Sequence, residues 1–208
     1  MCTVALIAAL VGTAWHLTTQ PNPQREEPDT SWYFGPPNAR WSITEYADFE
    51  CPYCRSYTPE LKRWVSTQQD VNLKWHHFPL QDDNLAALRG ARLAQCAGHL
   101  GGTEAFWQAI DQIISRGNSQ GFPASISLPT VTTEALDHCA DSDRTVAAEV
   151  FKQQNDARRR AVAATPTLDI RDALTGHTIR MEGPVDGATL LSIIDGLAAQ
   201  PAQAKGDQ

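Results

Sequence analysis

Two cysteines at the end of a strand-like run constrain the fold of this chain more than any other feature. In the stretch ITEYADFECPYC, residues 43–54, the period-2 alternation of a β-strand places Glu45 on the same face as several apolar side chains. Apolar residues then recur at helical spacing from Pro52 to Val65. The segment therefore predicts a strand that passes directly into a helix, with Cys51 and Cys54 at the start of that helix.

The segments that follow predict an α/β fold interrupted by helices. Residues 71–78 predict a second strand after the first helix. The later elements are expected, in chain order, to be a helical block at 84–163 that breaks at Gly101-Gly102, strands at 165–170 and 177–181, and a closing helix at 186–200. This order predicts an α/β frame with a helical domain inserted in its middle.

The sequence allows more detailed predictions for two of these helices. The last helix of the block should start at a cap formed by Ser142-Asp143 and run to about Ala163. The closing helix is amphipathic, and its inward-facing residues are expected to be Leu190, Leu191, Ile194 and Leu197.

The N-terminal region predicts export. Residues 3–15 form an uncharged apolar run, which is short for a membrane-spanning helix but suits the apolar core of a signal peptide. We therefore expect segment 1–17 to be a signal peptide or a retained membrane anchor, and 18–31 to be a linker. The protein would then be periplasmic or part of the cell envelope. The formal net charge of −7 argues against a nucleic-acid partner, which requires a basic surface.

A pair of cysteines two residues apart occurs in zinc sites, in structural disulfides and in redox sites. A structural zinc site needs four ligands. The residues that could complete one are the neighbours His138 and Cys139 or the neighbours His76 and His77, and adjacent side chains point in different directions. A structural disulfide across so short a loop would add little stability. We therefore expect neither a metal nor another cofactor.

The position of the pair at a helix start favours the redox site. The N-terminus of a helix stabilises a thiolate through its free N–H groups and its dipole. Cys51 is therefore the predicted nucleophile, and Cys54, one turn further and inside, is predicted to resolve the mixed disulfide that Cys51 forms. Pro52 and Tyr53, which lie between them, are expected to tune the redox potential.

Together with HHFPL, CAGHLGGTEAFWQ and ATPTLDI, the motif ITEYADFECPYC resembles the DsbA-like branch of the thioredoxin superfamily. The resemblance extends over residues 32–199. It implies a thioredoxin fold built from 32–80 and 164–200, with an inserted helical domain at 81–163 and a tail at 201–208. It also implies a thiol:disulfide oxidoreductase that acts on exported, cysteine-containing proteins and exchanges electrons with a membrane redox partner.

The resemblance assigns roles to three further residues. Pro166 matches the cis-proline that packs against the redox pair in this family, and Thr165 before it would offer backbone groups to an extended client. Glu45 matches the buried carboxylate below the pair, which is expected to have a raised pKa and to exchange protons with Cys54.

Cys96 and Cys139 both fall in the helical block. In an oxidising compartment two such thiols usually pair, although two separate buried cysteines are the alternative. Some members of the family carry a second disulfide in the helical domain, so the resemblance favours a Cys96–Cys139 bond.

Two positions depart from the best-known oxidases of the family, which carry His in place of Tyr53 and Val in place of Thr165. Both residues also occur in a dimeric isomerase and chaperone branch, but that branch has a dimerisation domain for which 18–31 is too short. The sequence therefore predicts a monomeric oxidase. A reductase or isomerase, and a redox-inactive binding or chaperone module, are the alternatives.

Overall fold

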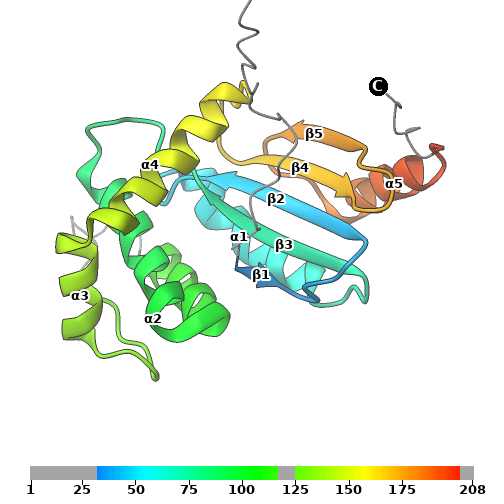
Figure 1. Ribbon diagram of the computed structural model, residues 1–208. Coiled ribbons are helices and arrows are strands. Elements are labelled where there is room, and N and C mark those ends of the chain that lie inside the picture. The colour runs from blue at the N-terminus through cyan, green and yellow to red at the C-terminus, as the bar shows by residue number, and fades with distance from the viewer. Residues whose placement is uncertain (1–31, 117–124, 202–208) are drawn as a thin grey trace, which may run out of the picture. The chain divides into compact units, whose positions relative to one another are not determined.

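The computed structural model describes residues 32–116 and 125–201; the predicted signal or anchor segment 1–17 and the linker 18–31 lie outside the described residues (Figure 1). The elements in chain order are β1 (Tyr33–Phe34), β2 (Trp41–Ala47), α1 (Pro52–Val65), β3 (Val71–His77), α2 (Leu85–Arg116), α3 (Thr133–Ser142), α4 (Arg144–Arg159), β4 (Thr167–Asp172), β5 (Thr178–Glu182) and α5 (Gly187–Ala198). Within the described residues, no helix combines the length and the apolar character needed to cross a membrane.

The five strands form one mixed sheet in the order β1-β3-β2-β4-β5. β2 lies at its centre, parallel to β3 and antiparallel to β4. In this register Glu45 lies between Trp75 on β3 and Leu168 on β4. The predicted α/β fold with a helical insertion is confirmed, because α2, α3 and α4 all fall between β3 and β4 and gather beside one end of the sheet, opposite α5 (Figure 1).

Helices cover both faces of the sheet. α1 and the segment before α5 meet on one face, where the Tyr57 hydroxyl donates to the carbonyl oxygen of Val185 at 2.8 Å. On the other face, Tyr46 and Phe78 are buried in a cluster with Ala157 of α4. Because side chains alternate along β2, Tyr46 points toward α4 while Glu45 points toward α1.

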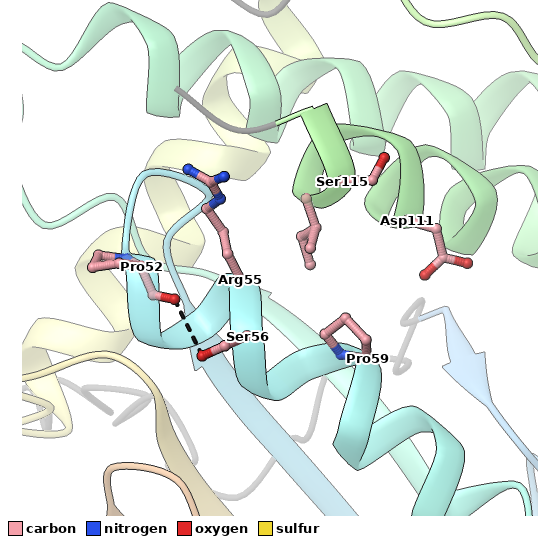
Figure 2. A pocket seen from close by; sticks show the side chains of 7 residues that line it. Pro52, Arg55, Ser56, Pro59, Asp111 and Ser115 are labelled. Atoms are coloured by element: carbon pink, nitrogen blue, oxygen red, sulfur yellow. Dashed lines mark hydrogen bonds between the residues drawn. The ribbon is translucent and has the colours of Figure 1, made fainter. Parts of the chain in front are cut away.

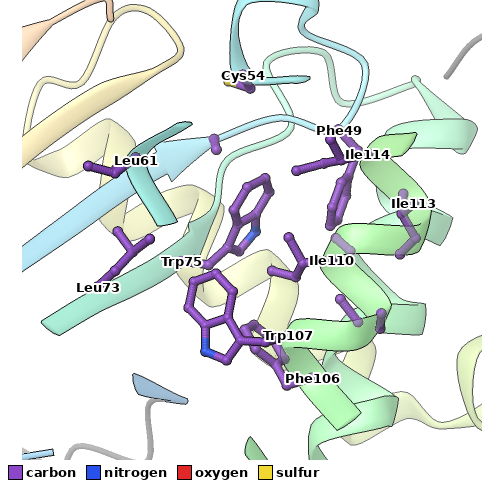
Figure 3. Close-up of a cluster of buried hydrophobic side chains, with 14 of the residues drawn as sticks. Phe49, Cys54, Leu61, Leu73, Trp75, Phe106, Trp107, Ile110, Ile113 and Ile114 are labelled. Carbon is purple, nitrogen blue, oxygen red and sulfur yellow. The ribbon is translucent and has the colours of Figure 1, made fainter. Parts of the chain in front are cut away.

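The helical block shares its hydrophobic core with the sheet. Phe49 and Trp75 stack with ring centroids 4.8 Å apart. Trp107 and Ile110, from the second half of α2, are buried in the same cluster (Figure 3). Cys54 lies at the edge of this cluster and is fully buried (Figure 3).

The predicted break in the long helical segment is confirmed at Gly102, whose φ of 75° and ψ of −168° are not helical. Asp143 caps α4 by accepting from the backbone N–H groups of Thr145 and Val146. The expected end near Ala163 is wrong, because α4 ends at Arg159. Ala161 adopts a left-handed φ of 57°, and the Val162 N–H donates back to Ala157 at 3.0 Å, which closes the helix in the manner of a Schellman motif.

The closing helix α5 also differs in one residue. Leu190, Ile194 and Leu197 are buried as expected, but Leu191 is 46% exposed. Leu191 follows Leu190 directly, and one residue rotates the side chain by about 100° around a helix axis. It therefore leaves the face that the other three residues share.

Cys96 of α2 and Cys139 of α3 are joined in a disulfide, with Cα atoms 6.0 Å apart and 43 residues apart in the sequence. Replacing both residues with Ala should lower the free energy of unfolding by about 3–4 kcal/mol, because closing a loop of this length restricts the unfolded chain. Urea unfolding of the double variant measures the loss. Each single variant also lacks the bond, so the difference between it and the double variant gives the part that is due to lost side-chain packing. Peptide mapping of the exported protein that finds free thiols at both positions would contradict this prediction.

Candidate active site

Cys51 lies at the junction of the sheet and α1. It is the N-cap residue of the helix, with φ of −74° and ψ of 120°, and Pro52 occupies the first helical position. Proline suits this position because its missing N–H would have no helical partner. The Cys51 thiol is half-buried, and its Sγ donates to the carbonyl oxygen of Thr165 at 3.2 Å.

Cys54 lies in the first turn of α1 and is fully buried. Both Cys51 and Cys54 are free thiols, so the structure corresponds to the reduced pair. Burial raises the pKa of the Cys54 thiol, and the nearby carboxylate of Glu45 raises it further. Of the two sulfur atoms, only that of Cys51 is partly accessible to an incoming client.

Glu45 reaches from β2 toward α1 and is fully buried. Its Oε1 accepts a hydrogen bond of 2.7 Å from the Thr58 hydroxyl. Burial raises the pKa of Glu45 to about 8, and the Thr58 hydrogen bond offsets only part of that rise. A carboxyl group with this pKa is mostly protonated at neutral pH, so it can donate a proton as well as accept one.

Thr165 and Pro166 immediately precede β4 and are joined by a cis peptide bond. Thr165 is buried, and its carbonyl oxygen faces the Cys51 sulfur. The structure thus brings together Cys51, Cys54, Glu45 and Thr165, which the sequence distributes over 120 positions from β2 to β4. Their individual roles in catalysis stay predictions.

Tyr53 is 64% exposed and lies in the first turn of α1, two residues after Cys51.

Two polar residues that the sequence analysis did not single out stabilise the surroundings of the cysteine pair. Asp48 fixes the turn before Cys51 by accepting from the N–H groups of Glu50 at 2.9 Å and Leu80 at 3.0 Å. The second of these residues is Thr58, whose hydroxyl donates to Oε1 of Glu45. The signals that could have found them are the Asx-turn tendency of Asp after a strand, and a Thr one helical turn beyond Cys54.

An open groove of about 690 Å³ begins at the first turn of α1 and separates that helix from the second half of α2 (Figure 2). It is lined by Pro52, Arg55, Ser56, Pro59, Asp111, Ile114 and Ser115. The groove starts next to Cys51, and its lining is mixed in polarity.

Three of the residues considered as zinc ligands, Cys139, His76 and His77, have other partners. Cys139 is bonded to Cys96. His76 contacts the carbonyl oxygen of Gln153 at 2.7 Å, whereas His77 accepts from the indole N–H of Trp75 at 2.9 Å. Burial lowers the pKa of His76 to about 4 and that of His77 to about 3. Within residues 32–116 and 125–201, no group of three His, Cys, Asp or Glu side chains could hold a metal ion.

Comparison with known proteins places this arrangement in a family. The family model described as Thioredoxin matches residues 27–195. The crystal structure of Pseudomonas aeruginosa DsbA2 is 43% identical in sequence, covers 85% of this chain and 97% of its own, and superposes with a TM-score of 0.75. A variant of alpha-DsbA1 from Wolbachia pipientis shares the fold with a TM-score of 0.65 at 18% identity, over 86% of this chain and 93% of its own.

A Na⁺/H⁺ antiporter, NhaA 1 of Salinispora arenicola, is 30% identical over 148 residues, which are 68% of this chain but 22% of that protein. The chain thus spans under a quarter of the length of this curated relative. The match to the Thioredoxin model includes Cys51 and Cys54, and both this match and the one to DsbA2 extend over most of the chain. The chain therefore belongs to the thioredoxin family and, within it, to the DsbA-like thiol:disulfide oxidoreductases.

Proposed function

We propose that this protein oxidises paired cysteines in exported proteins by cycling Cys51 and Cys54 between a disulfide and two thiols. The observation that carries the proposal is the asymmetry of the pair. Cys51 lies at a helix N-terminus with a partly accessible sulfur, and Cys54 is sealed inside with a raised pKa. An accessible sulfur can be attacked by a client, and a buried one can leave and return without meeting the client.

The proposed reaction has two exchange steps. A client thiolate attacks Sγ of Cys51, the Cys51–Cys54 bond breaks, and its electron pair leaves on Cys54. Glu45, protonated at neutral pH, gives its proton to the Cys54 thiolate. The second client thiolate then attacks the client sulfur of the mixed disulfide. The client leaves oxidised, and Cys51 leaves as a thiolate that the helix N-terminus stabilises.

The surroundings of Cys51 support a client bound in extended form. Thr165 and cis-Pro166 border the sulfur, and an exposed backbone edge can pair with an extended segment. Tyr53 adds an exposed aromatic ring at the same place. We expect the client segment that carries the reacting cysteine to lie across these residues.

The proposal includes export to an oxidising compartment. The apolar run at 3–15 and the Cys96–Cys139 disulfide both support this location. One structural relative, at 18% identity, is described as a periplasmic thioredoxin-like protein from Salmonella enterica. A catalytic oxidant must pass on the electrons it takes, and we expect a membrane redox protein to accept them from a monomeric enzyme.

The redox potential of the Cys51–Cys54 pair tests the direction of the reaction. A strong oxidant has a stabilised thiolate, and a His at position 53 would supply a positive charge that Tyr53 lacks. We expect the potential to lie above the value of about −270 mV typical of thioredoxin. Tyr53→His should raise it by roughly 30 mV or more, the equivalent of about one pKa unit in the leaving thiol.

Equilibration of each protein with glutathione buffers measures both potentials. Tyr53→Phe is the matched control, since it keeps the ring and adds no charge, and it should leave the potential unchanged. A wild-type potential near that of thioredoxin would favour the reductase alternative. An unchanged or lower potential in Tyr53→His would show that residue 53 does not set the redox potential of the Cys51–Cys54 pair.

A further inference from the structure

Thr58 makes an unusual contact for a threonine inside a helix. A hydroxyl in a helix commonly bonds a carbonyl of the preceding turn, as that of Ser56 does with Pro52 and Tyr53. The Thr58 hydroxyl instead donates to a residue outside its own helix, Glu45 on β2, with a distance of 2.7 Å to Oε1. Thr58 and Glu45 are both fully buried. The contact therefore links α1 to the central strand beneath the redox pair.

The two oxygens of Glu45 consequently have different surroundings. Oε1 holds the Thr58 hydrogen bond, whereas Oε2 is buried and has no hydrogen-bond partner among the described residues. The neighbours of Glu45 within the sheet, Trp75 and Leu168, do not titrate. Buried polar atoms are rarely left without a partner, so an unpaired carboxyl oxygen below a thiol site indicates an atom used in the reaction.

Among the described residues, the two groups whose pKa shifts include a contribution from the Glu45 charge are both on α1. They are Cys54 and Tyr57, whose pKa values its charge raises. The Tyr57 hydroxyl is committed to the carbonyl oxygen of Val185. Cys54 is therefore the group on α1 with which Glu45 can exchange a proton during the reaction.

We infer that Thr58 is a positioning residue for proton exchange between Glu45 and Cys54: its hydroxyl fixes Oε1 as an acceptor and leaves Oε2 to carry the proton. This inference rests on the proposed function, because the proton is needed when the Cys51–Cys54 disulfide opens. In that step the client thiolate bonds to Cys51, the electron pair leaves on Cys54, and the proton passes from Oε2 to that sulfur. Glu45 then regains a proton from solvent.

The direction of transfer follows from the two acidities. Burial raises the pKa of Cys54 above its ordinary value of 9.0, while that of Glu45 is about 8. The proton therefore moves downhill from Glu45 to the Cys54 thiolate. A carboxyl group that rotated freely would present this proton in the wrong direction part of the time, and the Thr58 bond prevents such rotation.

Thr58→Val tests the inference, because valine keeps the shape of the side chain and removes the donor. Two measurements on the full chain are needed. Carbon NMR of the reduced protein follows the titration of the Glu45 carboxyl, and rapid mixing of the oxidised protein with a dithiol peptide gives the rate of disulfide opening. We expect Thr58→Val to raise the titration midpoint of Glu45 by about one pH unit and to slow disulfide opening about tenfold.

Three further variants complete the design. Thr58→Ser keeps the hydroxyl and should restore both the midpoint and the rate. Ser56→Ala removes a hydroxyl from the same helix that does not touch Glu45, and it should change neither. Thr58→Ala replaces Thr58→Val if the valine variant fails to fold.

The outcomes separate this inference from the proposed function. If the wild-type protein oxidises the peptide and Thr58→Val does so at the same rate, the positioning role is overturned and the oxidase survives, whether or not the midpoint of Glu45 moves. If Thr58→Ser is as slow as Thr58→Val, the hydroxyl is not the cause and the inference also fails. If the wild-type protein does not react with the peptide, the proposed function is overturned and the positioning role falls with it.

Discussion

Cys51→Ser should abolish thiol–disulfide exchange, whereas Cys54→Ser should accumulate a mixed disulfide with its client. Cys51 is the partly exposed cysteine at the helix start. Without its sulfur, a client thiolate has no disulfide to attack, and in insulin reduction no thiolate of this protein can attack the insulin disulfide. In the reductive direction the Cys51 thiolate attacks a client disulfide, and without Cys54 the mixed disulfide persists because the thiol that would release the client is missing. Insulin reduction measures the activity, and non-reducing electrophoresis detects the trapped client. Unchanged insulin reduction by Cys51→Ser would overturn this assignment.

Alkylation of the reduced protein provides an independent check on the same assignment. At mildly acidic pH, iodoacetamide should modify Cys51 and spare Cys54, since burial both shields the Cys54 sulfur and raises its pKa. Mass mapping that finds Cys54 labelled and Cys51 intact would reverse the two roles.

A protein that binds clients yet shows no thiol-dependent activity would favour the redox-inactive binding module instead.

Glu45→Gln should raise the free energy of unfolding relative to the wild type, by an amount that grows between about pH 4.5 and pH 8 and is constant above that range. Burial raises the pKa of Glu45 from 4.5 to about 8. Between these values the unfolded chain has lost the proton and the folded chain has kept it, so the free energy of unfolding falls by about 1.4 kcal/mol per pH unit. The variant has no proton to lose at this position. It should therefore gain, relative to the wild type, on the order of 4 kcal/mol by pH 8.

Urea unfolding of the reduced proteins from pH 4 to pH 9 measures this difference. The two proteins should be similar near pH 4, where the carboxyl is protonated in both the folded and the unfolded chain, and the difference should level off above pH 8. Glu60→Gln replaces an exposed carboxylate of α1 and is the matched control, expected to leave the pH dependence unchanged. A constant difference between Glu45→Gln and the wild type across this range would mean that Glu45 is not held protonated.

Local patterns in the amino-acid sequence were sufficient to predict the order of the elements and the position of the cysteine pair. The alternation along residues 41–47 and the helical spacing after Pro52 are local signals, and they place Glu45 on the core face and Cys51 at the helix start. The break at Gly102 and the cap at Asp143 follow from backbone preferences of single residues. Such features depend on neighbours in the chain, so a sequence without a structure can reveal them.

The atomic contacts at the site, in contrast, could not be predicted before the fold was known. The Cys51 sulfur faces the carbonyl oxygen of Thr165. Thr58 donates to one oxygen of Glu45, and the other has no hydrogen-bond partner in the part of the chain that the structure describes. Likewise, the side chains of Leu190 and Leu191 differ by about 100° around the axis of α5, and the packing of this helix decides that the face of Leu190 is the buried one. These contacts join segments that are distant in sequence or compete for one surface. They are fixed by packing across the sheet, which no local pattern of residues records.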